Sequence, residues 1–334
     1  MPYRIGSFNI LRPLTKGKTA ERVAAIIKDN RLDVVALQEV SSQDGLGKLL
    51  NILGRSVWSY SHASDYATAS TDHRIRASKE YAFVWRRDKV LLVREPHICN
   101  EIEKRVDYAW QNHLNLQLQR VSNMHDPEEL DEEDDRQTPG SVSLSFSERK
   151  KRVVEALTAD LCRPPMVDCF RPGGFWGGLR WELRMINVHI RCVGRIGLRE
   201  KEYRLIAGKI HTALNTRRFG NFRSVYTIVA GDYNLSLSQI ENAVKCPEFE
   251  RDCEKHNMIA VQNALTTLKQ YDESQTPPLQ GEEIYNKNVD HFTYDKKRVE
   301  QILSDAVRVD CSPSFKIHRT EISDHVPIYV EMNL

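Results

Sequence analysis

Residues 320–334, TEISDHVPIYVEMNL, contain a strand pattern that begins directly after three polar residues. Apolar residues occupy every second position over 326–332, which is the period of a strand with one buried face. The strand is entered through Ser-Asp-His at 323–325, a hydroxyl, a carboxylate and an imidazole. Because a rigid strand holds side chains more accurately than a loop does, we expect it to fix Asp324 and His325 at the edge of a sheet.

Other apolar runs along the chain have the length and residue types of strands and helices. Strands are predicted at 4–11, 33–40, 80–87, 90–95, 167–172, 182–190, 225–234 and 288–295, and helices at 20–28, 45–53 and 199–214. The strands on either side of Asp88 and Lys89 are expected to form a hairpin. Strands that alternate with helices, together with hairpins, indicate an α/β protein with mixed sheets.

The length of 334 residues suits one large α/β domain or two small ones. With 40% hydrophobic and 28% charged residues, the composition is that of a globular protein. We expect a single domain over 1–334. Residues 100–165 fit its pattern poorly and are expected to form an insertion that contains an acidic, disordered loop at 126–141.

The net charge of +2 conceals an uneven distribution. Residues 126–135, DPEELDEEDD, carry eight acidic groups and no basic one, so the rest of the chain has a net charge of +10. A basic body suits a polyanionic partner such as nucleic acid, and we expect DNA. The acidic loop is expected to contact a regulatory protein or the basic surface of the same chain.

The sequence has no apolar run near the roughly 20 residues that span a bilayer, so no membrane partner is expected. The N-terminus, MPYRIGSFNI, lacks the apolar region of a signal peptide, and none of the seven cysteines lies in a C-x-x-C pair. We therefore expect reduced thiols and a cytoplasmic or other intracellular location.

Polar residues that can serve a metal ion or a phosphate stand at or near the ends of the predicted strands. They are Asn9, Glu39, Glu80, Arg171, His189, Asp232, Asn234, Asp290, Asp324 and His325. Each alone has an ordinary explanation as a turn, surface or core residue. Together they suit hydrolysis of a phosphate ester, because Mg²⁺ prefers oxygen ligands and imidazoles can donate to phosphate oxygens and carry protons.

Five short motifs occur in a characteristic order: FNI (8–10), LQEV (37–40), NVH (187–189), GDYN (231–234) and SDH (323–325). In type and order they resemble the signature set of the endonuclease/exonuclease/phosphatase superfamily. The segments around Glu80-Tyr81, Phe170-Arg171-Pro172 and NVDHF (288–292) are similar to its deoxyribonuclease I-like branch. The resemblance implies a four-layer α/β/β/α sandwich of two mixed sheets, with the active site where both sheets end.

The same resemblance implies a role for each of these residues. Catalysis would use His189, His325, Asp232, Glu80, Asp290 and Asn234, substrate contacts would come from Arg171, Asn234 and Tyr81, and metal ligands from Glu39, Asn9 and Asp324. Glu80 would orient His189, Asp290 would orient His325, and the two histidines would bracket the scissile phosphate.

The expected activity is cleavage of phosphodiester bonds in DNA by a Mg²⁺-dependent endonuclease, in which Mn²⁺ or Ca²⁺ can replace Mg²⁺. One alternative is a phosphatase or phosphodiesterase of the same fold that acts on a phosphoinositide, sphingomyelin or a nucleotide. A second alternative, of another class, is a catalytically inactive binding module.

Overall fold

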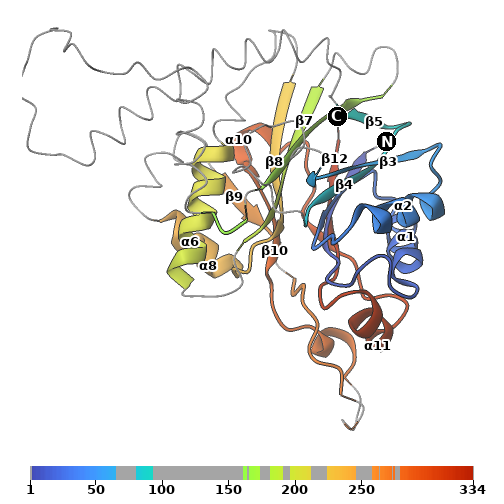
Figure 1. The fold of residues 1–334 in the computed structure, drawn as a ribbon. Coiled ribbons are helices and arrows are strands. Elements are labelled where there is room, and N and C mark those ends of the chain that lie inside the picture. Colours follow the sequence, from blue (N-terminus) through green and yellow to red (C-terminus); the bar gives the residue numbers. More distant parts are fainter. Residues whose placement is uncertain are drawn as a thin grey trace, which may run out of the picture. The chain divides into compact units, whose positions relative to one another are not determined.

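A computed structural model gives the structure of most of the chain outside residues 93–160 (Figure 1). It describes residues 2–64, 80–92, 161–163, 165–173, 181–190, 196–211, 224–245, 258–262, 264–272, 274 and 279–333. Apart from Leu161, these residues belong to one compact unit made of residues 1–93 and 162–334. Residues 100–160 of the predicted insertion, with the acidic loop at 126–141, lie outside the described residues.

The first sheet has six strands. In spatial order they are β11 (Val307–Arg308), β12 (Ile328–Met332), β1 (Tyr3–Asn9), β2 (Val34–Gln38), β4 (Ala82–Arg86) and β3 (Trp58–His62). Strands β1 and β2 run parallel, and the other neighbours run antiparallel. The chain reaches β2 from β1 through a helix, which is the connection that a parallel pair requires.

The second sheet also has six strands. In spatial order they are β5 (Val90–Leu92), β6 (Met166–Pro172), β7 (Trp181–His189), β8 (Ser224–Asp232), β10 (Asp290–Asp295) and β9 (Met258–Val261). Strands β7 and β8 are the parallel pair here. The predicted hairpin around Asp88 and Lys89 is wrong, because β4 pairs within the first sheet and β5 pairs with β6 in the second.

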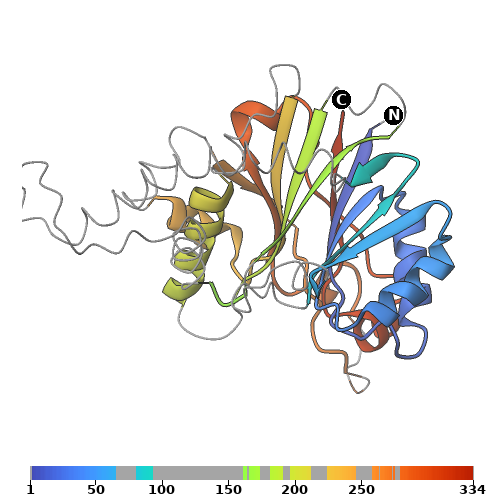
Figure 2. The same cartoon turned by 45° about the horizontal axis from the view of Figure 1, so that its top comes forward.

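The two sheets pack face to face around a shared apolar core (Figure 2). Ile5 and Phe83 of the first sheet belong to the same buried cluster as Phe170 and Met185 of the second. The rings of Phe83 and Phe170 meet edge to face with centroids 5.7 Å apart, a favoured geometry for aromatic pairs. Alternating apolar side chains on both sheets therefore build one central layer.

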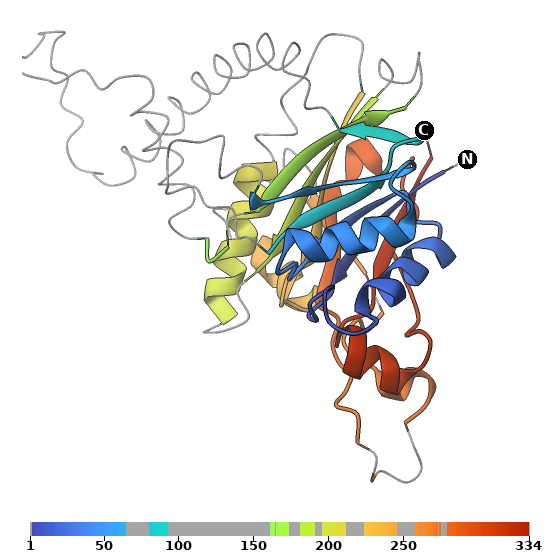
Figure 3. The same ribbon diagram turned by 45° about the vertical axis from the view of Figure 1, so that its right-hand side comes forward.

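Helices α1 (Thr19–Asp29) and α2 (Gln43–Leu53) cover the outer face of the first sheet (Figure 3). Val23 and Leu46 of these helices share a buried cluster with Phe8 and Val35 of β1 and β2. The side chain of Ser42 accepts a hydrogen bond from a backbone N–H in the first turn of α2 and begins that helix.

Helices also lie on the outer side of the second sheet, and short helical turns fill the connections. They are α6 (Ile196–Arg204), η2 (Leu205–Ile210), α8 (Leu237–Val244), η3 (Gly281–Ile284), α10 (Lys296–Val299), α11 (Phe315–Ile317) and η4 (His318–Ile322). The predicted four-layer α/β/β/α sandwich is confirmed. No helix in the described part of the chain is both long enough and apolar enough to cross a bilayer.

Candidate active site

Strand register brings the polar ends of both sheets to one place. In the parallel pair β1 and β2, Asn9 lies opposite the residue that precedes Glu39. In the second sheet, Asp232 lies opposite His189 on one side and opposite Asp290 on the other. Carboxyl ends of parallel strands are where open α/β sheets place functional groups.

The carboxylate of Asp232 is the centre of the site. Its Oδ2 lies 3.2 Å from Nδ2 of Asn9, 3.6 Å from Nε2 of His189 and 3.6 Å from Nε2 of His325. Only 2% of the Asp232 residue is exposed. The two sheets and the C-terminal loop thus direct one amide and two imidazoles at a single buried carboxylate.

The backbone on both sides of Asp232 explains the glycine and the asparagine of the GDYN motif. Gly231 has a φ of +155°, and a Cβ there would lie 1.9 Å from the carbonyl oxygen of Val188, so only glycine fits. Asn234 has a φ of +49°, its backbone N–H donates to Oδ1 of Asp232 at 2.9 Å, and its Nδ2 donates to the Ile190 carbonyl at 3.0 Å. Asn234 therefore joins β7 to β8 and orients Asp232.

The Ser-Asp-His segment is fixed to both sheets. Nδ1 of His325 lies 2.8 Å from Oδ2 of Asp290, so these two residues pair as expected. The hydroxyl of Ser323 donates to the Asn9 carbonyl at 2.6 Å and accepts from the backbone N–H of His325 at 3.0 Å. The serine at the start of the last strand therefore holds the imidazole beside β1.

The two histidines have opposite protonation states at neutral pH. Burial by itself lowers the pKa of His325, but Asp290 and Asp232 together outweigh it and raise the pKa to about 10. Burial lowers the pKa of His189 to about 4, and the nearby charge of Asp232 only partly opposes this change. His325 is therefore an imidazolium, and His189 is a neutral imidazole.

The surroundings of His189 differ from the expectation. Its backbone N–H donates to the hydroxyl of Tyr81 at 2.8 Å, and its Nδ1 has no hydrogen-bond partner among the described residues. Glu80, the expected partner, instead lies with its Oε2 3.3 Å from Nε of Arg163. Tyr81 is fully buried in the core between the sheets. The expected substrate contact by Tyr81 is therefore wrong, and its hydroxyl supports the His189 backbone instead.

The expected phosphate contact by Arg171 is also wrong. Strand β6 runs antiparallel to β7, and Phe170 lies opposite Leu183. Arg171 therefore lies beside the start of β7, whereas His189 is at its other end. Arg171 donates to Oε2 of Glu182 at 3.1 and 2.9 Å and is buried there. Glu182 precedes His189 by seven strand positions, which corresponds to roughly 23 Å.

Arg163, in contrast to Arg171, lies close enough to His189 for its charge to act on that imidazole. Arg163 lies just before β6. The first residue of β6, Met166, pairs with Asn187, which is two residues before His189 on β7. Burial is the largest influence on the pKa of His189, and the positive charge of Arg163 adds to the lowering. Arg-Pro occurs both at 163–164 and at 171–172, so the local sequence does not distinguish these two arginines.

Two groups of side chains are candidates for holding a metal ion. Asp232, Asp290 and His325 offer ligand atoms that lie within 4.8 Å of one another, all buried. Within this group, Nδ1 of His325 lies 2.8 Å from Oδ2 of Asp290, so one ligand atom of each already has a partner.

The second candidate consists of the expected ligands Glu39 and Asp324, each of which lies beside one of the two histidines. Glu39 has a φ of +59°, its side chain is 27% exposed, and burial raises the pKa of its carboxyl, so added positive charge would stabilise the ionised form. Asp324 is half-exposed, with Oδ1 4.0 Å from Nε2 of His325. Carboxylate oxygens open to water fit Mg²⁺, which keeps several of its waters.

Asn9 directs its amide nitrogen toward this group, and its expected role as a metal ligand stays a prediction. Its Nδ2 donates to Oε1 of Glu39 at 3.0 Å, whereas its Oδ1 accepts from the backbone N–H of Leu11. Asn9 therefore acts as a hydrogen-bond donor that links Glu39 to Asp232.

No protein-family model and no curated protein sequence matches the chain. Among solved structures, the chain is similar to an endonuclease/exonuclease/phosphatase protein from Bacteroides vulgatus, with 16% identity and a TM-score of 0.53 over 100% of this chain and 99% of that chain. It is also similar to D. rerio TDP2 complexed with single strand DNA product, with 13% identity and a TM-score of 0.50 over 100% and 99% of the two chains. The chain therefore has the fold of the endonuclease/exonuclease/phosphatase superfamily.

Proposed function

We propose that the chain is a divalent-metal-dependent hydrolase of phosphate esters, and that it cleaves phosphodiester bonds inside DNA. The observation that carries the proposal is the convergence of His189, His325 and Asn9 on the buried carboxylate of Asp232. Two imidazoles with opposite protonation states on either side of one carboxylate form an acid–base arrangement at neutral pH.

The protein groups supply the proton transfers of a hydrolysis. Asp232 and the neutral His189 are placed to orient a water molecule and accept its proton as the water oxygen attacks phosphorus. His325, which carries a proton, can donate it to the leaving ester oxygen as the P–O bond breaks. Asp290 contacts its other ring nitrogen and keeps the imidazole charged and oriented.

Glu39 and Asp324 would hold the divalent ion, for which Mg²⁺ is the expected species and Mn²⁺ or Ca²⁺ substitutes. A cation there supplies positive charge to the phosphate oxygens. Asn9, bonded to Glu39, keeps that carboxylate in place.

Three arginines beside the site support a polyanionic substrate. Arg163 pairs with Glu80, Arg199 donates to the Asn234 carbonyl at 2.9 Å, and Arg319 lies 3.8 Å from Asp324. They come from three different segments: the chain before β6, helix α6 and the turn η4. One phosphate does not need three guanidinium groups, whereas a DNA strand brings further phosphates to them.

A plasmid-nicking assay tests the proposal. With Mg²⁺ or Mn²⁺ the protein should convert supercoiled plasmid to the nicked form, and His189→Ala and Asp232→Asn should each lower the rate by about 10²-fold or more. Asp168→Asn is the matched control, because Asp168 is an equally buried carboxylate that contacts Ser61 outside the site. Asp168→Asn should keep its activity.

Either of two results would refute the proposal that the chain is a hydrolase. One is that the unchanged protein cleaves no phosphate ester, and the other is that the His189 and Asp232 variants cleave as fast as the unchanged protein. Release of inorganic phosphate from small esters without plasmid nicking would refute only the DNA substrate.

A further inference from the structure

The contact between Asp290 and His325 joins two different sheets. Asp290 begins β10 of the second sheet, which pairs with β8 and β9, whereas His325 lies shortly before β12 of the first sheet. Among the described strands, β10 and β12 share no ladder of hydrogen bonds. Another segment must therefore keep this carboxylate and this imidazole 2.8 Å apart.

The Thr-Thr-Leu segment, residues 266–268, contacts the backbone around His325. The backbone N–H of Val326 donates to the Thr266 carbonyl at 2.8 Å, and the N–H of Leu268 donates to the Asp324 carbonyl at 2.7 Å. Thr267 lies opposite His325 in this short antiparallel bridge. The residues before and after the imidazole are therefore both bonded to the same segment.

The hydroxyl of Thr266 contacts the backbone of Asp290. Its Oγ1 accepts from the N–H groups of Val289 and Asp290, both at 3.2 Å, and it donates to the Lys287 carbonyl at 3.4 Å. A hydroxyl has one proton and two lone pairs, so its full hydrogen-bonding capacity is used here. Thr266 is completely buried, so bulk water cannot replace the hydroxyl as acceptor for these N–H groups.

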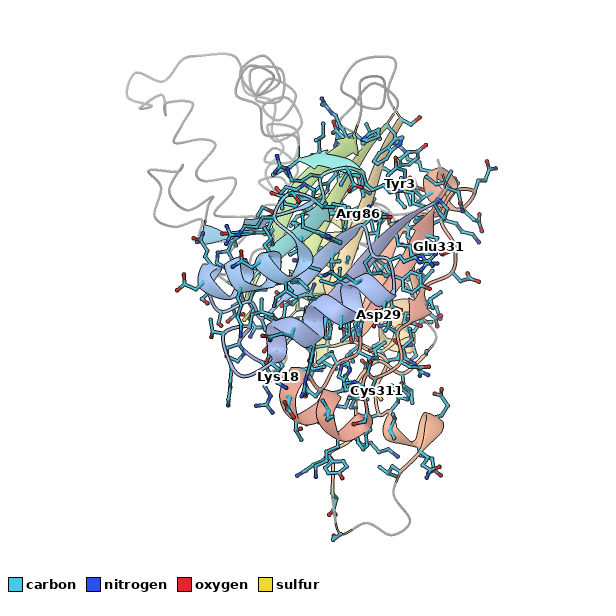
Figure 4. All side chains as sticks on the ribbon, turned by 90° about the vertical axis from the view of Figure 1, so that its right-hand side faces the viewer. Tyr3, Lys18, Asp29, Arg86, Cys311 and Glu331 are labelled. Carbon is cyan, nitrogen blue, oxygen red and sulfur yellow. The ribbon has the colours of Figure 1, made fainter. Side chains whose placement is uncertain are left out.

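An apolar cluster also holds the Thr-Thr-Leu segment beside His325. Leu268 packs there with Ile284, Tyr285 and Val326, and Cys311, which is labelled in Figure 4, packs against the cluster. Val326 directly follows His325. The packing that fixes Leu268 therefore also fixes the residue next to the imidazole.

We propose that Thr266 is a positioning residue for the pair of Asp290 and His325. Its hydroxyl fixes the backbone of Asp290 and its carbonyl fixes the backbone after His325, so one residue sets the distance between the two side chains. The inference rests on the proposed function, because it concerns the imidazole that would protonate the leaving oxygen. Thr266 acts through these two residues and is not itself a catalytic group.

The position of Asp290 in its strand makes this hydroxyl important. Asp290 is the first residue of β10, where the ladder begins. Without an acceptor for its N–H, the end of the strand would shift. Proton transfer is sensitive to displacements on the order of 1 Å, which can lower a rate by roughly 10²-fold.

Thr266→Val and Thr266→Ser form a matched pair for the test. Valine has nearly the shape of threonine without the hydroxyl, and serine keeps the hydroxyl without the methyl group. In the plasmid-nicking assay, Thr266→Val should lower kcat at least about tenfold while KM changes less than about twofold. Thr266→Ser should keep kcat within about threefold of the unchanged protein, because its hydroxyl can make the same hydrogen bonds.

Thr293→Val is the control for the loss of a buried hydroxyl. Thr293 lies on the same strand as Asp290 and is equally buried, but its hydroxyl bonds to Tyr203 and Tyr233. This variant should keep its kcat. Thr266→Ala, which removes the hydroxyl without adding bulk, gives the same comparison if Thr266→Val does not fold.

A measurement without any reaction separates this inference from the proposed function. The proton between Nδ1 of His325 and Asp290 should give a downfield proton NMR signal, which is assigned by its loss in His325→Gln. The signal should be lost or broadened in Thr266→Val and kept in Thr266→Ser and Thr293→Val. An unchanged signal in Thr266→Val, or equal losses in Thr266→Val and Thr266→Ser, would overturn the role of the hydroxyl. Absence of hydrolysis by the unchanged protein would refute the proposed function and leave the NMR comparison to decide the positioning.

Discussion

Replacing Asn187 by leucine tests whether buried hydrogen bonds between the sheets maintain the active site. Asn187 lies on β7 and is fully buried. Its Nδ2 donates to the Leu37 carbonyl at 2.9 Å and the Ala82 carbonyl at 3.1 Å, both on the other sheet. Its Oδ1 accepts from Nε2 of Gln38 at 2.7 Å. This residue therefore joins β7, which ends at His189, to β2, which leads to Glu39, and to β4.

The expected cost follows from these three hydrogen bonds. Leucine has a similar shape, so no cavity is added, but each lost bond costs about 1 kcal/mol net. The fully buried amide of Gln38 also loses its shortest contact, which costs about 1–2 kcal/mol more. Asn187→Leu should therefore lower the free energy of unfolding by about 3–5 kcal/mol.

Urea denaturation of the single and double variants measures this cost. Gln38→Leu combined with Asn187→Leu should be less destabilising than the sum of the two single changes by about 1–2 kcal/mol, because the double variant leaves neither amide without its partner. Thr293→Val is the control, since the Thr293 hydroxyl bonds to Tyr233 and to Tyr203 of α6 and to no described residue of the first sheet. Strict additivity, or a cost for Asn187→Leu below about 1 kcal/mol, would refute the reasoning.

Three further predictions concern single residues. Arg163→Ala should lower the rate of plasmid nicking by about tenfold or more. Arg171→Ala should mainly lower the free energy of unfolding, by roughly 3 kcal/mol, because Glu182 loses a buried partner. Equal effects of the two changes on nicking would contradict this assignment. Mg²⁺ should raise the melting temperature of the unchanged protein but not of Glu39→Ala, as measured by thermal denaturation with and without EDTA. Burial lowers the pKa of His318 from 6.5 to about 4, so this imidazole binds a proton more readily in the unfolded chain. The free energy of unfolding should therefore fall by up to about 3 kcal/mol as the pH falls from 6.5 to 4. His318→Gln should flatten this pH dependence in denaturant titrations.

The sequence predicted the end of each strand that contributes to the site because the signal there is local. An apolar run followed by a polar residue marks Glu39 and Asp232, and the alternation after His325 marks the last strand. Since strands of a mixed sheet bring such ends to common edges, their meeting point could be predicted without coordinates. The pairing of Asp290 with His325 followed from the resemblance and is present in the structure.

The incorrect predictions concern contacts and strands that depend on the pairing of segments far apart in the sequence. Arg171 and Arg163 have the same local sequence context, and only the pairing of β6 with β7 shows which of them lies beside the site. The turn at Asp88 looks like a hairpin, but whether the next strand stays in the sheet depends on where its apolar residues can be buried. Strand β3, with sequence WSYSH, was missed because it has few apolar residues and lies at a sheet edge.

The pKa values of the two histidines differ because a carboxylate contacts His325 directly, whereas the carboxylate that could contact His189 has another partner. Asp290 contacts His325 directly, and the Glu80 carboxylate, which could have served His189 in the same way, is paired with Arg163. An arginine that holds a carboxylate away from an imidazole lowers the pKa of that imidazole through its own charge and also removes the group that would raise it. The position of Arg163 therefore helps to keep His189 able to accept a proton at the pH at which His325 donates one. Arg163 therefore acts on the acid–base chemistry of the site through its charge and through its pairing with Glu80.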